Sequence, residues 1–172
     1  MKHLIFIILL LFSVSLSFGQ KGYSLLTTVP PPHFKNNSNE KDYRLNGLLL
    51  SPGGKFLVLD YGRKASTLAI FSFPDFDLKE VHRIEKTVEL SQTYFDNNDT
   101  LLYLKEDRYA PDYMVINVYN GRKMNVNCER TPRGCPSQAA GFAKIRMYSK
   151  DKKYLIQRSK DNKSMLEVFK KD

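Results

Sequence analysis

The side chains best suited to chemistry in this chain are few and lie far apart. Beyond residue 19 the only histidines are His33 and His82, and the only cysteines are Cys128 and Cys135. Little around either histidine suggests a catalytic base, so both are expected to be surface residues. The chain contains no Gly-x-Ser-x-Gly, His-Glu-x-x-His or Cys-x-x-Cys sequence. The sequence therefore predicts a noncatalytic protein with no metal site and no cofactor.

The two cysteines are separated by six residues in a loop that also holds proline, arginine and glycine. In an oxidising compartment such a pair is expected to form a local disulfide, Cys128–Cys135. The small loop limits its entropic stabilisation to under about 3 kcal/mol. Two thiolates with no histidine nearby do not complete a tetrahedral zinc site.

One loop mixes aromatic and charged residues in a way that suits binding. It runs from 107 to 113, and its candidate contact residues are Arg108, Tyr109, Asp112 and Tyr113. Loops held out by a rigid scaffold often carry binding function, although an ordinary solvated connection remains the alternative. The Asp96-Asn97-Asn98-Asp99 stretch has calcium-type oxygens but lacks the further ligands of a calcium loop, so a turn is expected there.

The N-terminus has the pattern of a secretory signal peptide. Lys2 precedes a continuous apolar run from Leu4 to Phe12. The small residues Ser17 and Gly19 are typical of a cleavage site, which is expected directly after Gly19. An N-terminal anchor helix is the alternative, although the run is shorter than the roughly 20 residues of a membrane span. Loss of Lys2 leaves 26 Lys and Arg against 18 Asp and Glu. The sequence predicts a secreted or periplasmic protein without a membrane span after cleavage.

The remaining chain is expected to comprise an N-terminal strand and polar linker, 20–42, and one domain, 43–172. This domain consists of three β-repeats at about 43–87, 88–135 and 136–172. Apolar residues recur mostly at every second position, which is typical of strands. Turn-forming residues separate the strands, and a 79–84 strand with interleaved charges suits a sheet edge. The expected strands are 23–29, 46–50, 55–61, 67–73, 79–84, 92–95, 100–105, 113–119, 122–127, 142–148, 153–158 and 165–169.

The hairpin sequence Ser51-Pro52-Gly53-Gly54-Lys55, between two apolar strands, resembles the S-P-D-G-K hairpin of WD40-like and TolB-like β-propeller repeats. Gly53 stands where that pattern has Asp, and the chain has no Trp for a Trp-Asp signature. The resemblance implies an all-β, propeller-like fold of antiparallel meander repeats. It also implies that strand 23–29 completes the last unit. Three units are fewer than the usual four to eight, so the fold is partial or completed by oligomerisation, as in a homodimer.

Basic residues concentrate near the C-terminus, where ten Lys and Arg face four acids between Lys144 and Asp172. This region either attracts an anionic partner or forms a solvated, aggregation-resistant face. The expected function is a binding or interaction module whose partner is another protein or an extracellular or envelope glycan. Export disfavours nucleic acid. The alternatives are a fragment of a hydrolase, since similar repeats accompany peptidase domains, and a structural envelope component that binds anionic surfaces.

Overall fold

The computed structural model describes residues 22–32, 44–62, 67–84, 89–105, 109, 111–130, 140–143 and 145–172. Within these residues the chain forms β-strands and one short 3₁₀ turn, with no α-helix, so the all-β prediction is confirmed. The strands are β1 Tyr23–Val29, β2 Leu45–Leu50, β3 Phe56–Tyr61, β4 Thr67–Ser72, β5 Leu78–Arg83, β6 Tyr94–Phe95, β7 Leu101–Leu104, β8 Asp112–Asn117, β9 Lys123–Asn127, β10 Ala140–Gly141, β11 Arg146–Tyr148, β12 Tyr154–Arg158 and β13 Leu166–Lys171, and the 3₁₀ turn η2 is Leu90–Gln92.

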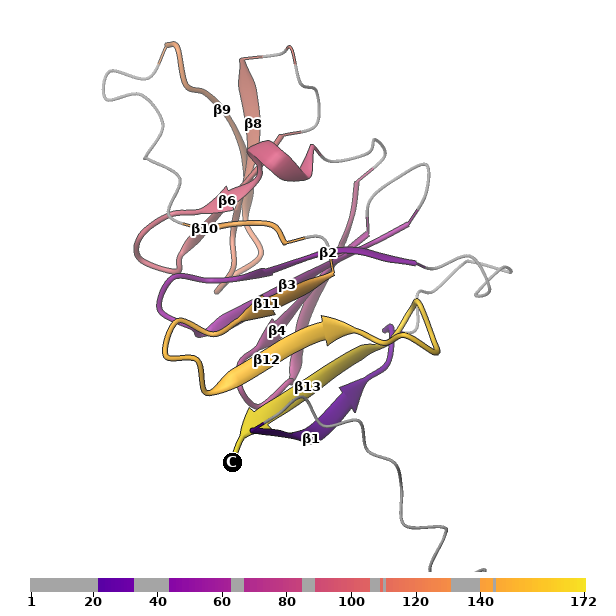
Figure 1. Cartoon of the computed structure of the whole chain (residues 1–172). Coiled ribbons are helices and arrows are strands. Elements are labelled where there is room, and N and C mark those ends of the chain that lie inside the picture. The colour runs from indigo at the N-terminus through magenta and orange to yellow at the C-terminus, as the bar shows by residue number, and fades with distance from the viewer. Residues whose placement is uncertain are drawn as a thin grey trace, which may run out of the picture.

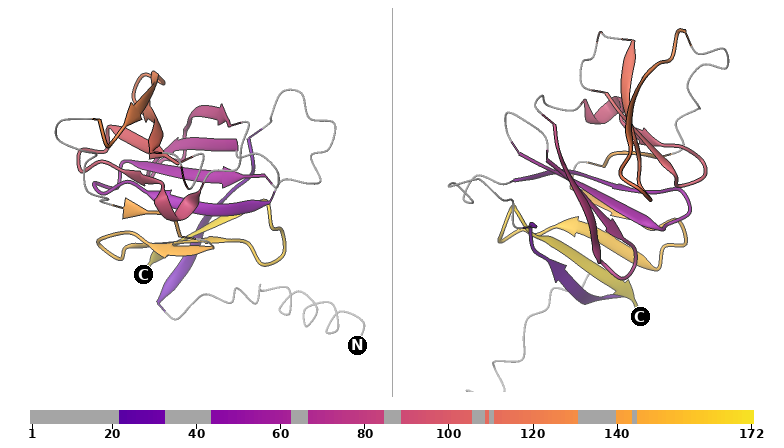
Figure 2. Two further views of the ribbon diagram at one scale, coloured as in Figure 1. Left: turned by 90° about the horizontal axis from the view of Figure 1, so that it is seen from above. Right: turned by 180° about the vertical axis from the view of Figure 1, so that it is seen from behind.

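The strands form three antiparallel sheets that follow the three repeats. The first sheet has the order β2-β3-β4-β5, the second β10-β6-β7-β8-β9 and the third β1-β13-β12-β11. Figures 1 and 2 show the first sheet lying between the other two. The described residues close neither a ring nor a barrel, so the three sheets form an open stack. The predicted edge strand is confirmed, because β5 ends the first sheet.

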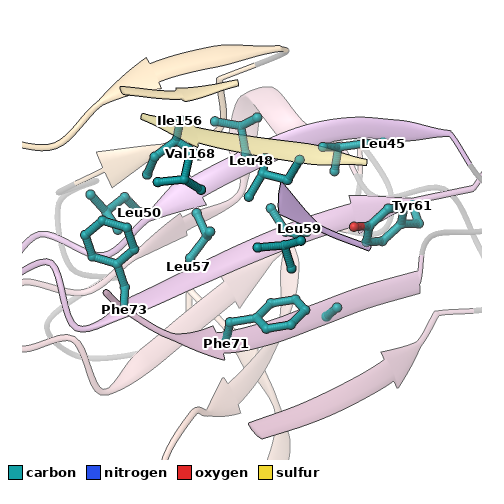
Figure 3. Packing of buried hydrophobic residues seen from close by; sticks show 13 residues of the cluster. Leu45, Leu48, Leu50, Leu57, Leu59, Tyr61, Phe71, Phe73, Ile156 and Val168 are labelled. Carbon is teal, nitrogen blue, oxygen red and sulfur yellow. The ribbon is translucent and has the colours of Figure 1, made fainter. Parts of the chain in front are cut away.

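The middle position of the first sheet explains its apolar sequence. Every residue of β3 is buried, and successive side chains point to opposite faces. Leu57 and Leu59 pack with Ile156 and Val168 of the third sheet, as Figure 3 shows. Val58 belongs instead to the cluster shared with the second sheet. A strand covered on both faces reads as a continuous hydrophobic run rather than an alternating one.

The N-terminal strand completes the third sheet, as predicted. β1 pairs with β13 in antiparallel register from Tyr23 opposite Lys171 to Val29 opposite Leu166. A bulge between Leu25 and Thr27 interrupts the ladder. Sheet closure of this kind joins opposite ends of the chain and covers one edge of β13.

The predicted single strand 142–148 is wrong. β10 instead pairs with β6 of the second sheet, and Ala143 forms an isolated bridge with Leu48 of the first sheet. Only from Arg146 does the chain enter the third sheet as β11. The segment 140–148 therefore runs from the second sheet past the first sheet to the third. On the way it forms backbone hydrogen bonds with β6 and then with β2. Periodicity of two does not reveal such a crossing, because each short piece remains extended.

One hairpin turn recurs in all three sheets. Its first residue donates its backbone N–H to the carbonyl five residues later, at 2.9 Å in each case, and its side-chain oxygen accepts that later residue's N–H. The three pairs are Ser51 with Phe56, Asp96 with Leu101, and Ser149 with Tyr154. A residue with positive φ follows three positions after the first, namely Gly54, Asp99 and Lys152. The sequence repeat is thus a repeat of local structure.

His82 is not a surface residue, contrary to the sequence-based expectation. Its side chain on β5 is 3% exposed, and its Nε2 lies 3.3 Å from Oε2 of Glu80. His82 pairs with Leu68, a member of the cluster between the first and second sheets. Burial lowers the pKa of His82, the Glu80 carboxylate opposes this shift, and Lys123 adds to it. The single sequence position could not show that this face of an edge strand is covered.

The buried His82 predicts a pH-dependent stability. The folded imidazole resists protonation, whereas the unfolded one ionises near pH 6.5. The unfolded chain therefore binds more protons as the pH falls below about 6.5, and the free energy of unfolding decreases there. Urea denaturation at several pH values between 5 and 7.5 should show a smaller decrease in His82→Gln than in the wild type. Equal decreases in the two proteins would contradict this assignment.

Candidate functional site

The structure describes three of the four predicted binding residues, and the predicted site as a whole stays a prediction. Arg108 lies outside the described residues, and Tyr109 is 88% exposed. Asp112 is exposed at the start of β8, while the neighbouring Tyr113 is half-buried. Adjacent residues on a strand point to opposite faces, so Asp112 and Tyr113 do not share a surface.

Tyr113 joins two tyrosines that the sequence analysis did not single out. The rings of Tyr94 and Tyr103 stack with centroids 5.1 Å apart, and Tyr113 meets them edge-on at 5.9 and 6.2 Å. The Lys105 ammonium lies 4.4 Å from the centre of the Tyr113 ring. Burial, assisted by the hydroxyls of Tyr113 and Tyr103, raises the pKa of Tyr94 to about 12. Tyr94 and Tyr103 are 5% and 6% exposed and pack with Val115, so this cluster contributes to the core of the second sheet.

A better candidate is a cleft between the first and third sheets, which we name the turn cleft. It lies where the β2–β3 and β11–β12 turns approach each other and has a volume of about 860 Å³. This size falls in the usual range of ligand pockets. Its lining residues are Leu50, Ser51, Pro52, Gly53, Gly54, Phe73, Pro74, Met147, Tyr148, Ser149, Lys150, Asp151 and Tyr154.

The wall of the turn cleft is apolar and rigidly packed. Leu50 and Phe73 are buried, and Met147 and Tyr154 pack against the same hydrophobic cluster. The Phe73 and Tyr154 rings meet edge-to-face with centroids 5.1 Å apart. Aromatic pairs in this arrangement add to the stability that their buried area provides. The wall is therefore a preformed apolar surface contributed by two repeats.

Polar groups of the repeated turn form the rim. The Ser149 hydroxyl donates to Oδ1 of Asp151 at 2.6 Å, and the Lys153 backbone N–H donates to the same oxygen at 3.1 Å. These bonds, the serine bond foremost, lower the pKa of Asp151. Asp151 is thus an ionised carboxylate whose hydrogen bonds stabilise the turn. Lys150 beside it is exposed and supplies a positive charge at the rim.

The polar groups of the turn cleft serve mainly to hold its turns. Among the described residues that line it there is no histidine and no cysteine, and the one carboxylate belongs to Asp151. Among the described residues, no three His, Cys, Asp or Glu side chains lie close enough to hold a metal ion. Asp96 and Asp99 serve the turns: Asp96 accepts from the Leu101 N–H, and Asp99 accepts from the Gly53 N–H. The arrangement places an apolar wall beside a charged rim, and its Ser149–Asp151 hydrogen bond belongs to the turn.

Two other expectations lie partly outside what the structure describes. Cys128 follows β9, but Cys135 falls outside the described residues, so the Cys128–Cys135 disulfide stays a prediction. Within the described part of the chain, no helix has the length and hydropathy needed to span a bilayer.

The sequence analysis missed the turn cleft because its wall comes from distant repeats. Phe73, Met147 and Tyr154 belong to three different segments, and none stands in a recognisable motif. The only available hint was the recurrence of the hairpin turn, since equivalent turns in stacked repeats lie at the same end of their sheets. A comparison of the chain with protein-family models, with curated proteins and with solved structures finds no match.

Proposed function

We propose that this protein is an exported, noncatalytic interaction module. Its turn cleft receives an apolar group of another protein or of an extracellular glycan-bearing partner. The observation that carries the proposal is the preformed apolar wall of Leu50, Phe73, Met147 and Tyr154 at an open cleft. Small-molecule and peptide sites share this design, in which apolar walls supply affinity and a few polar groups fix orientation.

The proposal can be tested with a simple aromatic probe, N-acetyl-tryptophanamide. We expect its addition to shift the backbone amide NMR signals of Gly53, Gly54, Ser149 and Tyr154, which line the turn cleft. Binding should be weak, with a dissociation constant on the order of millimolar, because a single ring buries little area. Amide shifts spread evenly over the three sheets would contradict the proposal.

A pair of matched variants localises this binding. Met147→Trp fills the turn cleft and should abolish the amide shifts. Met124→Trp makes the same change on β9, where Met124 is 42% exposed, and should leave the shifts unchanged. A hydrolytic activity that is lost in Asp112→Ala would instead favour the hydrolase alternative and end the noncatalytic proposal.

A further inference from the structure

The edge of the third sheet carries an unusual pair of exposed leucines. Leu25 and Leu26 on β1 are 50% and 48% exposed, next to the bulge in the β1–β13 ladder. β1 has no charged residue, whereas the outer strands β5 and β9 both contain lysine. Proteins usually place lysine or proline on such an edge to prevent association. Its leucines therefore need an explanation beyond the fold.

Lysines of β13 and of the β11–β12 turn lie near the start of β1. Lys171 pairs with Tyr23 and lies on the face of Leu25, whereas Lys170 pairs with Ser24 and points to the opposite face. The β11–β12 turn lies alongside, because the backbone N–H of Lys171 donates to the carbonyl of Lys153 at 2.8 Å. That turn adds Lys150, Lys152 and Lys153, and all five lysine side chains are exposed. The nearby carboxylates are Asp151, whose Oδ2 lies 3.5 Å from the Lys153 ammonium, Asp172, and Glu167 on β13, which accepts a hydrogen bond from Gln157.

Tyr23 links strand β1 to the β11–β12 turn. Its hydroxyl donates to the carbonyl of Lys152 at 2.7 Å, and its ring lies 6.0 Å from that of Tyr148. Tyr148 is 45% exposed, and the Arg146 guanidinium lies 5.3 Å from its ring centre. The surface thus combines two exposed leucines, two tyrosines and several cationic side chains. We name it the basic–leucine face, formed by Tyr23, Leu25, Leu26, Arg146, Tyr148, Lys150, Lys152, Lys153 and Lys171.

We propose that the basic–leucine face docks on an anionic lipid surface. Clustered lysines attract anionic headgroups, and their long side chains keep the charges at the headgroup level. Exposed leucines and tyrosines can then enter the interfacial region, where burial of apolar area adds affinity. A soluble acidic polymer satisfies the lysines but leaves the two leucines in water, so a lipid surface accounts for more of the face. The basic–leucine face shares Tyr148 and Lys150 with the turn cleft, but Leu25 and Leu26 lie outside it, so lipid docking does not require a ligand in the cleft.

The test is sedimentation of the chain from Gln20 onward with lipid vesicles. This chain keeps the whole described fold and lacks the apolar run Leu4–Phe12, which could itself enter a bilayer. We expect binding to vesicles of equal parts phosphatidylglycerol and phosphatidylcholine, weakening as salt rises, and little binding to phosphatidylcholine alone. No binding to the anionic vesicles overturns the proposal.

Two variants with matched controls separate lipid docking from simple charge attraction. Replacing Lys150, Lys152 and Lys153 with Gln should lower partitioning on the order of a hundredfold, at roughly fivefold per lysine. Replacing Lys160 and Lys163 with Gln, in the β12–β13 turn, should have a much smaller effect. Leu25→Ser with Leu26→Ser should also lower partitioning, whereas Leu78→Ser with Val81→Ser on β5 should not. Unchanged thermal melting establishes that each variant is folded.

The leucine variant decides between the two anionic partners. If Leu25→Ser with Leu26→Ser leaves vesicle binding unchanged, and soluble alginate competes fully with the vesicles, the face binds acidic polymers and lipid docking is overturned. Loss of binding in the leucine variant, with incomplete competition by alginate, supports lipid docking. Equal loss in the β5 variant also contradicts the proposal, because it shows general hydrophobic adsorption.

Discussion

Leu59→Ala should destabilise the fold by about 2–5 kcal/mol, the usual cost of removing a fully buried leucine side chain. Leu59 is 0% exposed in the central strand β3 and packs in the cluster between the first and third sheets. The surrounding side chains come from two sheets and cannot easily collapse into the cavity. Because domains are stable by only about 5–15 kcal/mol, this loss is a large share of the total.

Urea denaturation followed by circular dichroism measures this effect. With a slope of about 1–3 kcal/mol per molar urea, the midpoint should fall by roughly 1–2 M. Leu78→Ala is the matched control, since Leu78 is 47% exposed on β5 and should change stability by less than about 0.5 kcal/mol. Similar midpoints for the two variants would show that the sheets do not pack as described.

Gly53→Ala should cost about 1–3 kcal/mol through a contact between two repeats. The Gly53 backbone N–H donates to Oδ1 of Asp99 at 2.8 Å, and Asp99 is 3% exposed. A Cβ on Gly53 would clash with Oδ2 of Asp99, so the carboxylate must move away. When the Asp99 carboxylate moves, the hydrogen bond from the Gly53 N–H is lost. Losing a hydrogen bond is costly for groups that are shielded from water.

A double-mutant cycle tests this explanation. In an Asp99→Ala background the space is open and the hydrogen bond is already absent, so Gly53→Ala should become nearly neutral. Gly54→Ala provides the control. Gly54 has φ of 70° with no atom near the Cβ position, so its cost of about 1–2 kcal/mol arises from backbone strain and should persist in both backgrounds. An equal cost of Gly53→Ala in both backgrounds would rule out the Asp99 contact as the cause.

The Gly53–Asp99 contact also explains why glycine occupies this position of the β2–β3 turn. A side chain there would meet Asp99 of the second repeat. The packing of one repeat against the next, rather than a local turn preference, therefore favours glycine here.

Features governed by neighbours in sequence were predictable. Strand alternation and turn residues predicted the all-β class, and most strand ends fall within two residues of their expected positions. Ser51, Asp96 and Ser149 marked the three equivalent turns, because their hydrogen bonds reach only five residues along the chain. The pairing of β1 with β13 was also predicted, since a three-stranded last repeat left an uncovered edge.

Apart from the pairing of β1 with β13, features governed by distant segments were not predictable from the sequence. The burial of His82, the crossing of the chain at Ala143 and the apolar wall of the turn cleft each depend on which sheet packs against which. The lysines near the C-terminus were visible as a charge excess, but their position beside Leu25 and Leu26 follows from the pairing of β1 with β13. Local preferences act over a few residues, whereas burial and surface composition arise from contacts between residues up to the full chain length apart. The sequence therefore specified the strands and turns of this protein, and the stacking of its sheets decided which of their faces are open to a partner.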